Sequence, residues 1–278
     1  MEESADKIFV TPHAVILLDG ASAFVPVPVP ASAYADYLGR LLADALTADP
    51  AADLQEILAE GIKATAAHYD LRAGESPSST VTIARERDEH LDLLLLGDNT
   101  VILPGGEILT DDRIDRLDLE PRRKYRERLA AGHGYDDEHR ALLRELQTQQ
   151  AQYRNKPGGY WIAEADPLVA RQAVLTARSL SDTRWFVIAS DGAYNVMEHL
   201  NLVDWADYAK LDGRGLITLL HHCQEWEEND GTARRMPRAK KHDDKSIAVA
   251  NPSQEIKPAT TPRSHRSSTG SPPGQRNL

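Results

Sequence analysis

The sequence holds a single cysteine, Cys223, among its 278 residues. One thiol excludes a disulfide framework within the chain and a zinc site built from cysteines. Cys223 lies in a leucine-rich stretch with helical spacing, where a small buried apolar residue is the ordinary interpretation. No apolar run approaches the ~20 residues that a membrane-spanning helix needs. We therefore expect no association with a membrane.

A secretion signal is missing as well. The chain starts Met1-Glu2-Glu3-Ser4-Ala5-Asp6, which is acidic and lacks a basic segment followed by an apolar one. A cytoplasmic location is the resulting expectation. The formal net charge of −11 argues against a nucleic-acid binder that neutralises phosphates. An excess of carboxylates suits either an ordinary acidic protein or one that concentrates cations.

The composition changes near Asn251. Residues 252–278 are rich in proline, serine, threonine and arginine and hold almost no large apolar side chain. Such a segment cannot bury enough surface to offset the entropy lost on ordering. The sequence thus predicts one domain over residues 1–250 and a disordered basic tail over 251–278. The tail is interpreted as a solvated extension, with a docking or phosphorylated segment as the alternative.

Strand and helix patterns alternate within residues 1–250. Apolar spacing predicts helices over residues 31–46 and 54–69. The sequence also predicts a long polar helix over residues 136–153 and a helix over residues 216–226. Short apolar runs predict strands over residues 14–18, 80–84, 91–96, 100–103, 158–162, 184–189 and 246–250. The prolines of residues 25–30 exclude a helix and a central strand there. This order suits sheets packed together with helices outside, rather than regular βαβ winding.

Four aspartates stand at the ends of apolar strands beside turn residues. They occur in Leu18-Asp19-Gly20, Gly97-Asp98, Asp191-Gly192 and Asp243-Asp244. A carboxylate at a strand end can be aimed into a shared cleft, and hard divalent cations take oxygen ligands. Asp-Gly is also a common ordinary turn. The pattern alone leaves both a turn and a cation site open.

Five motifs taken in order resemble those of the type 2C, metal-dependent protein serine/threonine phosphatases. They are Leu18-Asp19-Gly20, Ser79-Thr80-Val81, Gly97-Asp98-Asn99, Ser190-Asp191-Gly192 and Asp243-Asp244-Lys245-Ser246-Ile247, and the resemblance covers roughly residues 6–250. It implies an α+β fold: a four-layer α-β-β-α sandwich of two mainly antiparallel sheets flanked by helices. It also implies a centre of two divalent cations, Mn²⁺ or Mg²⁺, at one end of the sandwich.

The resemblance assigns roles to individual residues. Asp19 resembles the carboxylate that bridges the two metals, and Gly20 would offer its backbone carbonyl to the second metal. Asp191 and Asp243 resemble the remaining ligands of the first metal. Asp98 is similar to a residue that helps to hold a weaker third metal in some members. In addition, Thr80 matches a position that lines the site, and Asp6 resembles the end of an Asn-Glu-Asp motif.

The activity implied is hydrolysis of phosphoserine and phosphothreonine in proteins, with Asp19, Asp191 and Asp243 as the catalytic residues. A water held between the two ions would attack phosphorus directly, without a phosphoenzyme intermediate. The implied partner is a phosphorylated protein, and the chain is expected to be a monomer.

The chain departs from the family pattern in several places. The family usually has an arginine shortly before Asn-Glu-Asp that grips the substrate phosphate, and no arginine precedes Asp6 here. Ala5 replaces the glutamate of that motif, and Ala21 stands where many members carry histidine. Asn195 stands where an acidic residue is frequent. Two alternatives therefore stay open: a catalytically weak or inactive module that binds phosphoproteins, and a phosphatase of small phosphate esters.

Other polar residues carry weaker hypotheses. His133 lies in a glycine-rich loop that could overhang the cleft and donate a proton. His221 and His222 are adjacent on a predicted helix, so their side chains point about 100° apart and favour a surface pair over a metal site. The basic run at residues 234–241 leads directly into Asp243. It could attract a phosphorylated substrate or simply form a solvated loop.

Overall fold

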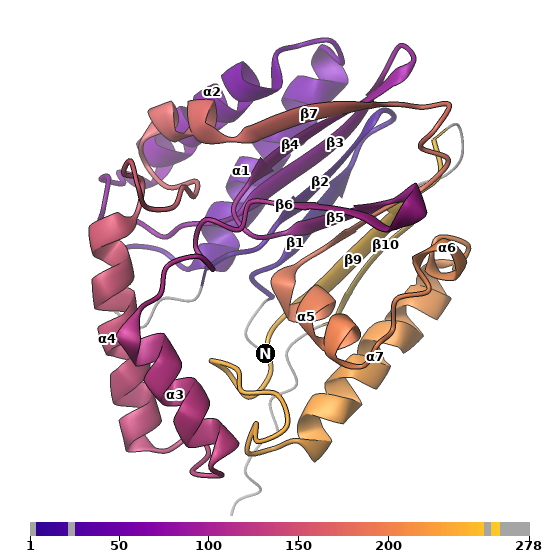
Figure 1. Ribbon diagram of the computed structural model, residues 1–278. Helices are drawn as coiled ribbons and strands as arrows, with labels where there is room; N and C mark the ends of the chain where they lie inside the picture. The colour runs from indigo at the N-terminus through magenta and orange to yellow at the C-terminus, as the bar shows by residue number, and fades with distance from the viewer. Residues whose placement is uncertain (1–3, 22–25, 253–256, 262–278) are drawn as a thin grey trace, which may run out of the picture.

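Two five-stranded antiparallel sheets form the centre of the fold in the computed structural model, which describes residues 4–21, 26–252 and 257–261 (Figure 1). The first sheet has the order β1-β2-β3-β4-β7, with β1 Lys7–Val10, β2 Ala14–Leu18, β3 Val81–Arg87, β4 His90–Leu96 and β7 Val174–Ser179. The second has the order β10-β9-β8-β5-β6, with β5 Thr100–Leu103, β6 Glu107–Thr110, β8 Phe186–Ala189, β9 Lys245–Ala250 and β10 Lys257–Thr261.

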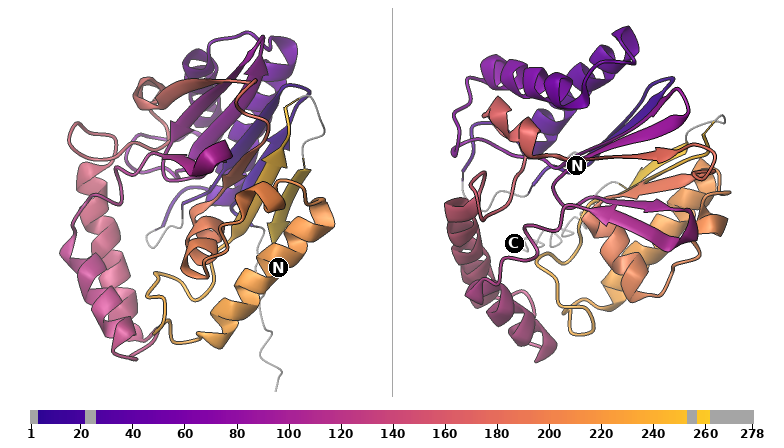
Figure 2. Two further views of the ribbon diagram at one scale, coloured as in Figure 1. Left: turned by 45° about the vertical axis from the view of Figure 1, so that its right-hand side comes forward. Right: turned by 45° about the horizontal axis from the view of Figure 1, so that its top comes forward.

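Helices cover the outer face of each sheet (Figure 2). Helices α1 Ala31–Ala48 and α2 Leu54–Tyr69 pack on the first sheet. Helices α5 Asp191–His199, α6 Trp205–Tyr208 and α7 Gly213–Asn229 pack on the second. The two sheets face each other across a third apolar cluster. The result is a four-layer α-β-β-α sandwich, which confirms the predicted fold class.

Strand β2 shows why its sequence is continuously apolar. All five of its residues are buried. Ile16 and Leu18 belong to the cluster under α1 and α2, whereas Val15 and Leu17 belong to the cluster between the sheets. Because successive side chains of a strand point to opposite faces, a strand covered on both faces needs apolar residues at every position. Asp19 follows at the point where this burial ends.

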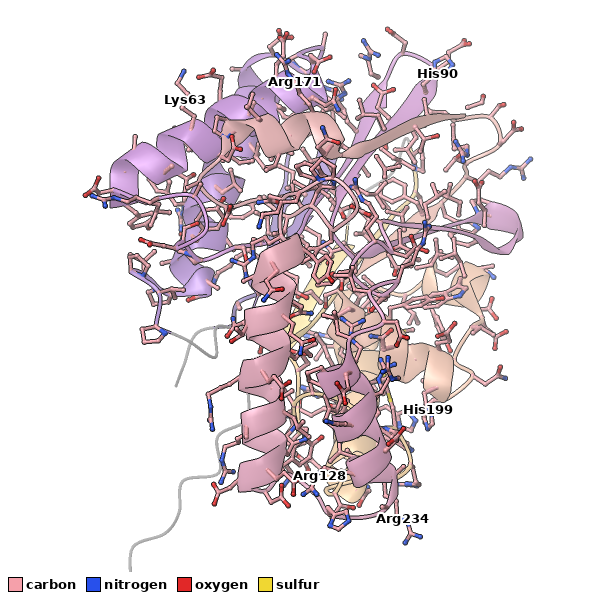
Figure 3. The ribbon with its side chains drawn as sticks, turned by 60° about the vertical axis from the view of Figure 1, so that its left-hand side comes forward. Lys63, His90, Arg128, Arg171, His199 and Arg234 are labelled. Carbon is pink, nitrogen blue, oxygen red and sulfur yellow. The ribbon has the colours of Figure 1, made fainter. Side chains whose placement is uncertain are left out.

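A helical hairpin stands beside the sandwich. It consists of α3 Glu120–Ala130 and α4 Asp137–Tyr153, whose contacts build a separate apolar cluster around Leu129 and Leu143. Ala233 and Ala239, from the segment after α7, pack against the same cluster. Figure 3 shows the hairpin with Arg128 near its tip, where the Arg128 guanidinium lies 2.6 Å from Asp136. The hairpin and the segment after α7 are thus packed together.

The predicted helices at residues 31–46, 54–69, 136–153 and 216–226 are confirmed, the last as part of α7. The strand predicted over residues 158–162 is wrong. Asn155 and Gly158 have φ values of 52° and 79°, and the Asn155 side chain accepts a hydrogen bond from the Ile162 backbone N–H. Left-handed backbone at two positions makes a tight turn. Tyr160 forms an isolated bridge with Arg154 instead.

Several elements had no matching prediction, namely β1, β6, β7, α3, α5 and α6. Two 3₁₀ helices also occur, at Pro104–Gly106 and Pro167–Gln172. Within the segment predicted as a disordered tail, residues 257–261 form β10, which pairs with β9. The remainder of that segment, at 253–256 and 262–278, lies outside the described residues, and so does residue 25 of the proline repeat. None of the helices in the described part of the chain is long and apolar enough to cross a membrane.

Candidate metal centre

Strand pairing gathers the predicted site residues at one end of the sandwich. Lys7 lies opposite Leu18, Val81 opposite Leu96, and Ala189 opposite Ile247. The residues within two positions of these strand ends must therefore share that end. They include Asp6, Asp19, Thr80, Asp98, Asp191 and Asp243.

A cleft of about 720 Å³ opens at this end. Its lining includes Asp19, Asp98, Asp191 and Asp243, the four aspartates singled out in the sequence, together with Thr80. The α3–α4 hairpin and the segment after α7 line its other sides. Gly20 is buried beside this region, and its backbone N–H donates to the Ala5 carbonyl at 3.2 Å.

The carboxylates in the cleft raise one another's pKa. Burial is the largest cause of the raised pKa of Asp19, and the negative charges of Asp6, Asp191 and Asp243 add to it. Burial likewise raises the pKa of Asp98 to about 8, with Asp191 as the main charged contributor. Carboxylates held together away from water resist ionisation unless a cation is near. The cluster is therefore built to attract positive charge.

Asp6 is the most enclosed member of the group, with 2% of its surface exposed. Neither of its carboxylate oxygens makes a hydrogen bond of ordinary geometry to the described residues. Burial raises its pKa to about 7, and the charges of Asp244 and Asp243 act in the same direction. The Ser190 side chain acts on that pKa in the opposite direction but does not offset burial. A carboxylate enclosed with so little hydrogen bonding is costly unless a cation completes its environment.

A lysine stands among these carboxylates. The Lys240 Nζ lies 2.5 Å from Asp243 Oδ1. Burial pushes the pKa of Asp243 upward, but Lys240, together with Lys245 and the Asp244 backbone N–H, outweighs burial and holds that pKa below its ordinary value. Sequence reasoning treated Lys240 only as part of a basic run. Its spacing of three residues from Asp243 was the available signal, but only the fold shows that the loop turns the ammonium inward.

The backbone around Asp19 is held by its neighbours. The Thr80 hydroxyl accepts a hydrogen bond from the Asp19 N–H at 3.0 Å, and the Thr80 N–H donates to the Asp19 carbonyl at 2.9 Å. Gly97, with φ of 91°, packs so closely that an added Cβ would lie 2.7 Å from a Thr80 methyl. Thr80 thus holds the backbone of Asp19 in place.

Asp191 opens helix α5 directly after β8, next to the segment that carries Asp243. An added Cβ on Gly192 would lie 2.2 Å from the Asp244 carbonyl oxygen. The Ser190 hydroxyl accepts from the Ser246 N–H at 3.0 Å. Glycine at 192 therefore permits the close approach that brings Asp191 and Asp243 into one cleft.

The other residues singled out in the sequence differ in whether they line the cleft. Ala21 and Asn195, at two of the departures from the family pattern, line the cleft. His133 is exposed and does not contribute to its lining. His221 and His222 are exposed on α7. Within the described ranges, no three His, Cys, Asp or Glu side chains are already arranged around a common metal position, so the four aspartates share a cleft without forming a coordination shell.

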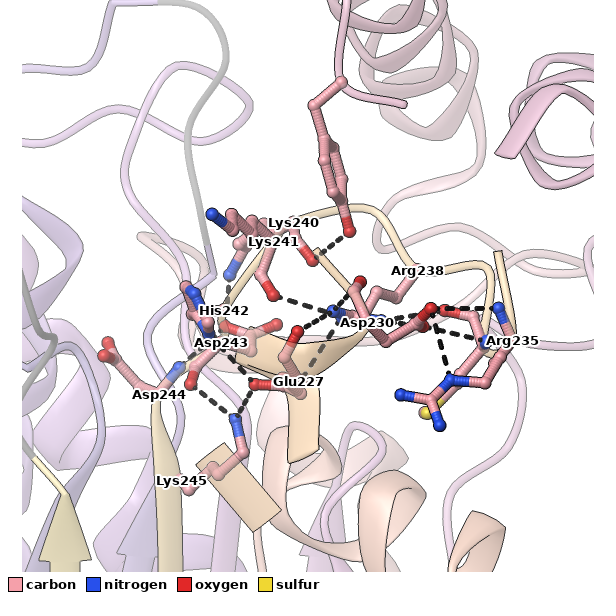
Figure 4. Close-up of polar contacts among 12 residues, drawn as sticks. Glu227, Asp230, Arg235, Arg238, Lys240, Lys241, His242, Asp243, Asp244 and Lys245 are labelled. Carbon is pink, nitrogen blue, oxygen red and sulfur yellow. Dashed lines mark hydrogen bonds and ion pairs between the residues drawn. The ribbon is translucent and has the colours of Figure 1, made fainter. Parts of the chain in front are cut away.

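The basic run at 234–241 is only partly a solvated loop. Arg234, Arg235 and Lys241 are exposed, but Arg238 and Lys240 turn inward. The Arg238 guanidinium lies 3.0 Å from Asp230 and 3.4 Å from Glu227 on α7 (Figure 4). The positive charge of Arg238 is therefore paired with carboxylates of the protein itself. Both inward-facing side chains also line the cleft.

No protein-family model matches this chain, and no curated protein sequence matches it. Its fold resembles that of serine/threonine phosphatases. The serine-threonine phosphatase 2C of Toxoplasma gondii is similar at 15% identity over 90% of each chain, with a TM-score of 0.49. PppA of Pseudomonas aeruginosa, described as a key regulatory component of T6SS, is similar at 16% identity over 92% of each chain, with a TM-score of 0.49.

The catalytic domain of the serine/threonine protein phosphatase PstP, solved with two manganese ions, is similar at 17% identity. The similarity covers 92% of this chain and 93% of that one, with a TM-score of 0.47.

Proposed function

We propose that this chain is a divalent-metal-dependent phosphatase that hydrolyses phosphoserine and phosphothreonine in proteins. The observation that supports it most is the convergence of Asp19, Asp98, Asp191 and Asp243 from four distant segments on one cleft. Asp19, Asp191 and Asp243 are proposed as the catalytic carboxylates. The monomeric state and the cytoplasmic location remain predictions.

The chemistry of the donors fits Mn²⁺ or Mg²⁺. These hard cations take carboxylate and carbonyl oxygens as ligands. The cleft offers buried carboxylates whose ionised form is unfavourable unless a cation lies nearby. The buried carboxylate of Asp6, which lacks ordinary hydrogen bonds to the described residues, supports the same conclusion. In the proposal Asp19, Asp191 and Asp243 hold the ions with the Gly20 carbonyl, and Asp98 serves a weaker third ion. Bound ions of this kind lower the pKa of a water and stabilise charge on phosphoryl oxygens.

Cationic side chains of the cleft are proposed to hold the substrate phosphate. Arg122 and Arg126 line the cleft from α3. Arg122 is engaged by the Ile114 carbonyl at 3.1 Å, whereas Arg126 is exposed. An arginine opposite an acidic floor can attract a phosphate monoester and orient it.

The test is phosphate release from a phosphoserine peptide by the full chain. Release should require Mn²⁺ or Mg²⁺ and stop on addition of a chelator. Asp191→Ala should abolish it, because a carboxylate of the proposed centre is lost. Asp44→Ala, which removes an exposed carboxylate on α1, is the control and should retain activity. Release that persists in Asp191→Ala or in chelator would contradict the proposal.

A second candidate is a catalytically weak module that binds phosphoproteins. The contact of Lys240 with Asp243 favours it, since a predicted metal ligand is already paired with a cation. It predicts binding of a phosphopeptide with negligible turnover at saturating Mn²⁺. The third possibility is a phosphatase of small phosphate esters. It predicts faster phosphate release from small phosphate esters than from phosphopeptides in the same assay.

A further inference from the structure

The Lys240 ammonium occupies the acidic cluster from within the chain. Its Nζ lies 2.5 Å from Asp243 Oδ1, and the two side chains are only 21% and 29% exposed. Asp19 and Asp191 are close enough to act on Lys240 electrostatically as well. A tethered cation therefore already satisfies a carboxylate that the proposed function assigns to a metal ion.

The segment that carries Lys240 is anchored to helix α7. Lys245, at the start of β9, lies 2.6 Å from Glu227, and each side chain is 1% exposed. Arg238 joins the same network through Asp230 and through the Glu227 backbone carbonyl at 3.1 Å (Figure 4). Charges buried with several partners hold their segment in one arrangement, because separating them exposes unpaired charge.

The α3–α4 hairpin holds the same segment from the opposite side. The Tyr135 hydroxyl donates to the Lys240 carbonyl at 2.9 Å. The His139 Nε2–H donates to the Ala239 carbonyl at 2.8 Å, and His139 is only 1% exposed. Two adjacent carbonyls of the segment are thus fastened to the hairpin that forms one wall of the cleft.

We propose that Lys240 is a built-in competitor for divalent cations at Asp243. In the chain as folded, the ammonium neutralises Asp243, and a metal ion gains that carboxylate only when Lys240 withdraws. Two positive charges within a few ångströms of one carboxylate repel each other, so ammonium and metal exclude each other there. The inference rests on the proposed metal centre. It adds that the position of Lys240 sets the affinity of that centre for divalent cations.

The hairpin contributes to this control. Because Tyr135 and His139 hold the backbone at residues 239 and 240, the ammonium is kept over Asp243 while the hairpin is in place. A movement of the hairpin that breaks these contacts frees the segment and with it the carboxylate.

The experiment measures Mn²⁺ binding to the full chain by isothermal titration calorimetry, without any substrate. Lys240→Met removes the charge and keeps a side chain of similar length, and it should lower the Kd at least tenfold. Lys241→Met removes the neighbouring exposed lysine and should leave the Kd unchanged. Tyr135→Phe retains the ring but loses the contact with the Lys240 carbonyl, and it should lower the Kd by a smaller factor.

A Kd for Lys240→Met that equals or exceeds that of the unaltered chain overturns the inference, and so does the absence of Mn²⁺ binding in both. Far-UV circular dichroism checks that each variant is folded, and Lys240→Gln gives the same comparison should the methionine variant not fold. Lys240→Arg keeps the charge and should bind as the unaltered chain does. Failure of the proposed phosphatase activity is a separate result, since it would leave these affinities as they are.

Discussion

The Lys245 ammonium and the Glu227 carboxylate form a fully buried ion pair, 2.6 Å apart, that joins strand β9 to helix α7. Lys245 also donates to the Asp243 carbonyl at 3.0 Å. The pair therefore connects the outer helix of the second sheet to the backbone of a predicted metal ligand.

Glu227→Gln should destabilise the protein by about 3–5 kcal/mol, since it removes the negative charge that lies 2.6 Å from the buried Lys245 ammonium. Chemical unfolding followed by circular dichroism measures this change. Glu228→Gln is a matched control, because residue 228 is the exposed neighbour on the same helix. Equal stability of the two variants would show that the buried pair does not hold β9 to α7.

Asp230 should make the protein sensitive to acid. Burial pushes its pKa upward, but the backbone N–H groups of Arg235 and Met236 and the Arg238 side chain outweigh burial and lower it. A carboxyl whose folded pKa lies below its unfolded value stabilises the fold above that unfolded value. This contribution is lost as the pH falls from about 5 to below 4, because the proton then binds the unfolded chain more readily.

Asp230→Asn should lower the free energy of unfolding at pH 7 by about 1–3 kcal/mol. The Asp230 carboxylate accepts three hydrogen bonds, from Arg235, Met236 and Arg238, and a neutral amide would weaken or lose them. The variant should also show a flatter decline of stability below about pH 5. Urea titrations at a series of pH values measure both effects. A decline as steep as that of the unaltered chain would place the acid sensitivity elsewhere.

Replacement of Asp6 should show how much its buried carboxylate destabilises the metal-free protein. In chelator at pH 8, Asp6→Asn should raise the melting temperature, because it removes one buried negative charge from beside Asp19 and Asp243. The rise in melting temperature on addition of Mn²⁺ should be smaller in the variant than in the unaltered chain, since a bound ion would have less charge to neutralise. Differential scanning calorimetry with and without Mn²⁺ measures both. If Mn²⁺ raised the melting temperature of the variant as much as that of the unaltered chain, Asp6 would not contribute to cation binding.

Periodicity in the sequence sufficed for the elements that bury a regular face. Tyr34, Leu38 and Leu42 recur at helical spacing along α1 and are all buried against the first sheet. It failed at residues 158–162, where an apolar run follows two left-handed positions and forms a turn. Apolar composition alone does not distinguish a strand from a turn that happens to be buried, because the backbone conformation depends on contacts elsewhere.

The sequence by itself predicted packed sheets with helices outside and the four strand-end aspartates, because apolar spacing and turn residues are local properties of the chain, while the four-layer α+β order came from the family resemblance. Only the tertiary structure decided that Asp6 lies buried among them and that Lys240 pairs with Asp243. Whether a lysine in a basic run faces solvent or a carboxylate depends on how the segment is anchored. That anchoring comes from α7 and the α3–α4 hairpin, whose contacts span up to 105 positions of sequence. Electrostatic contacts act through space, so residue order does not reveal them.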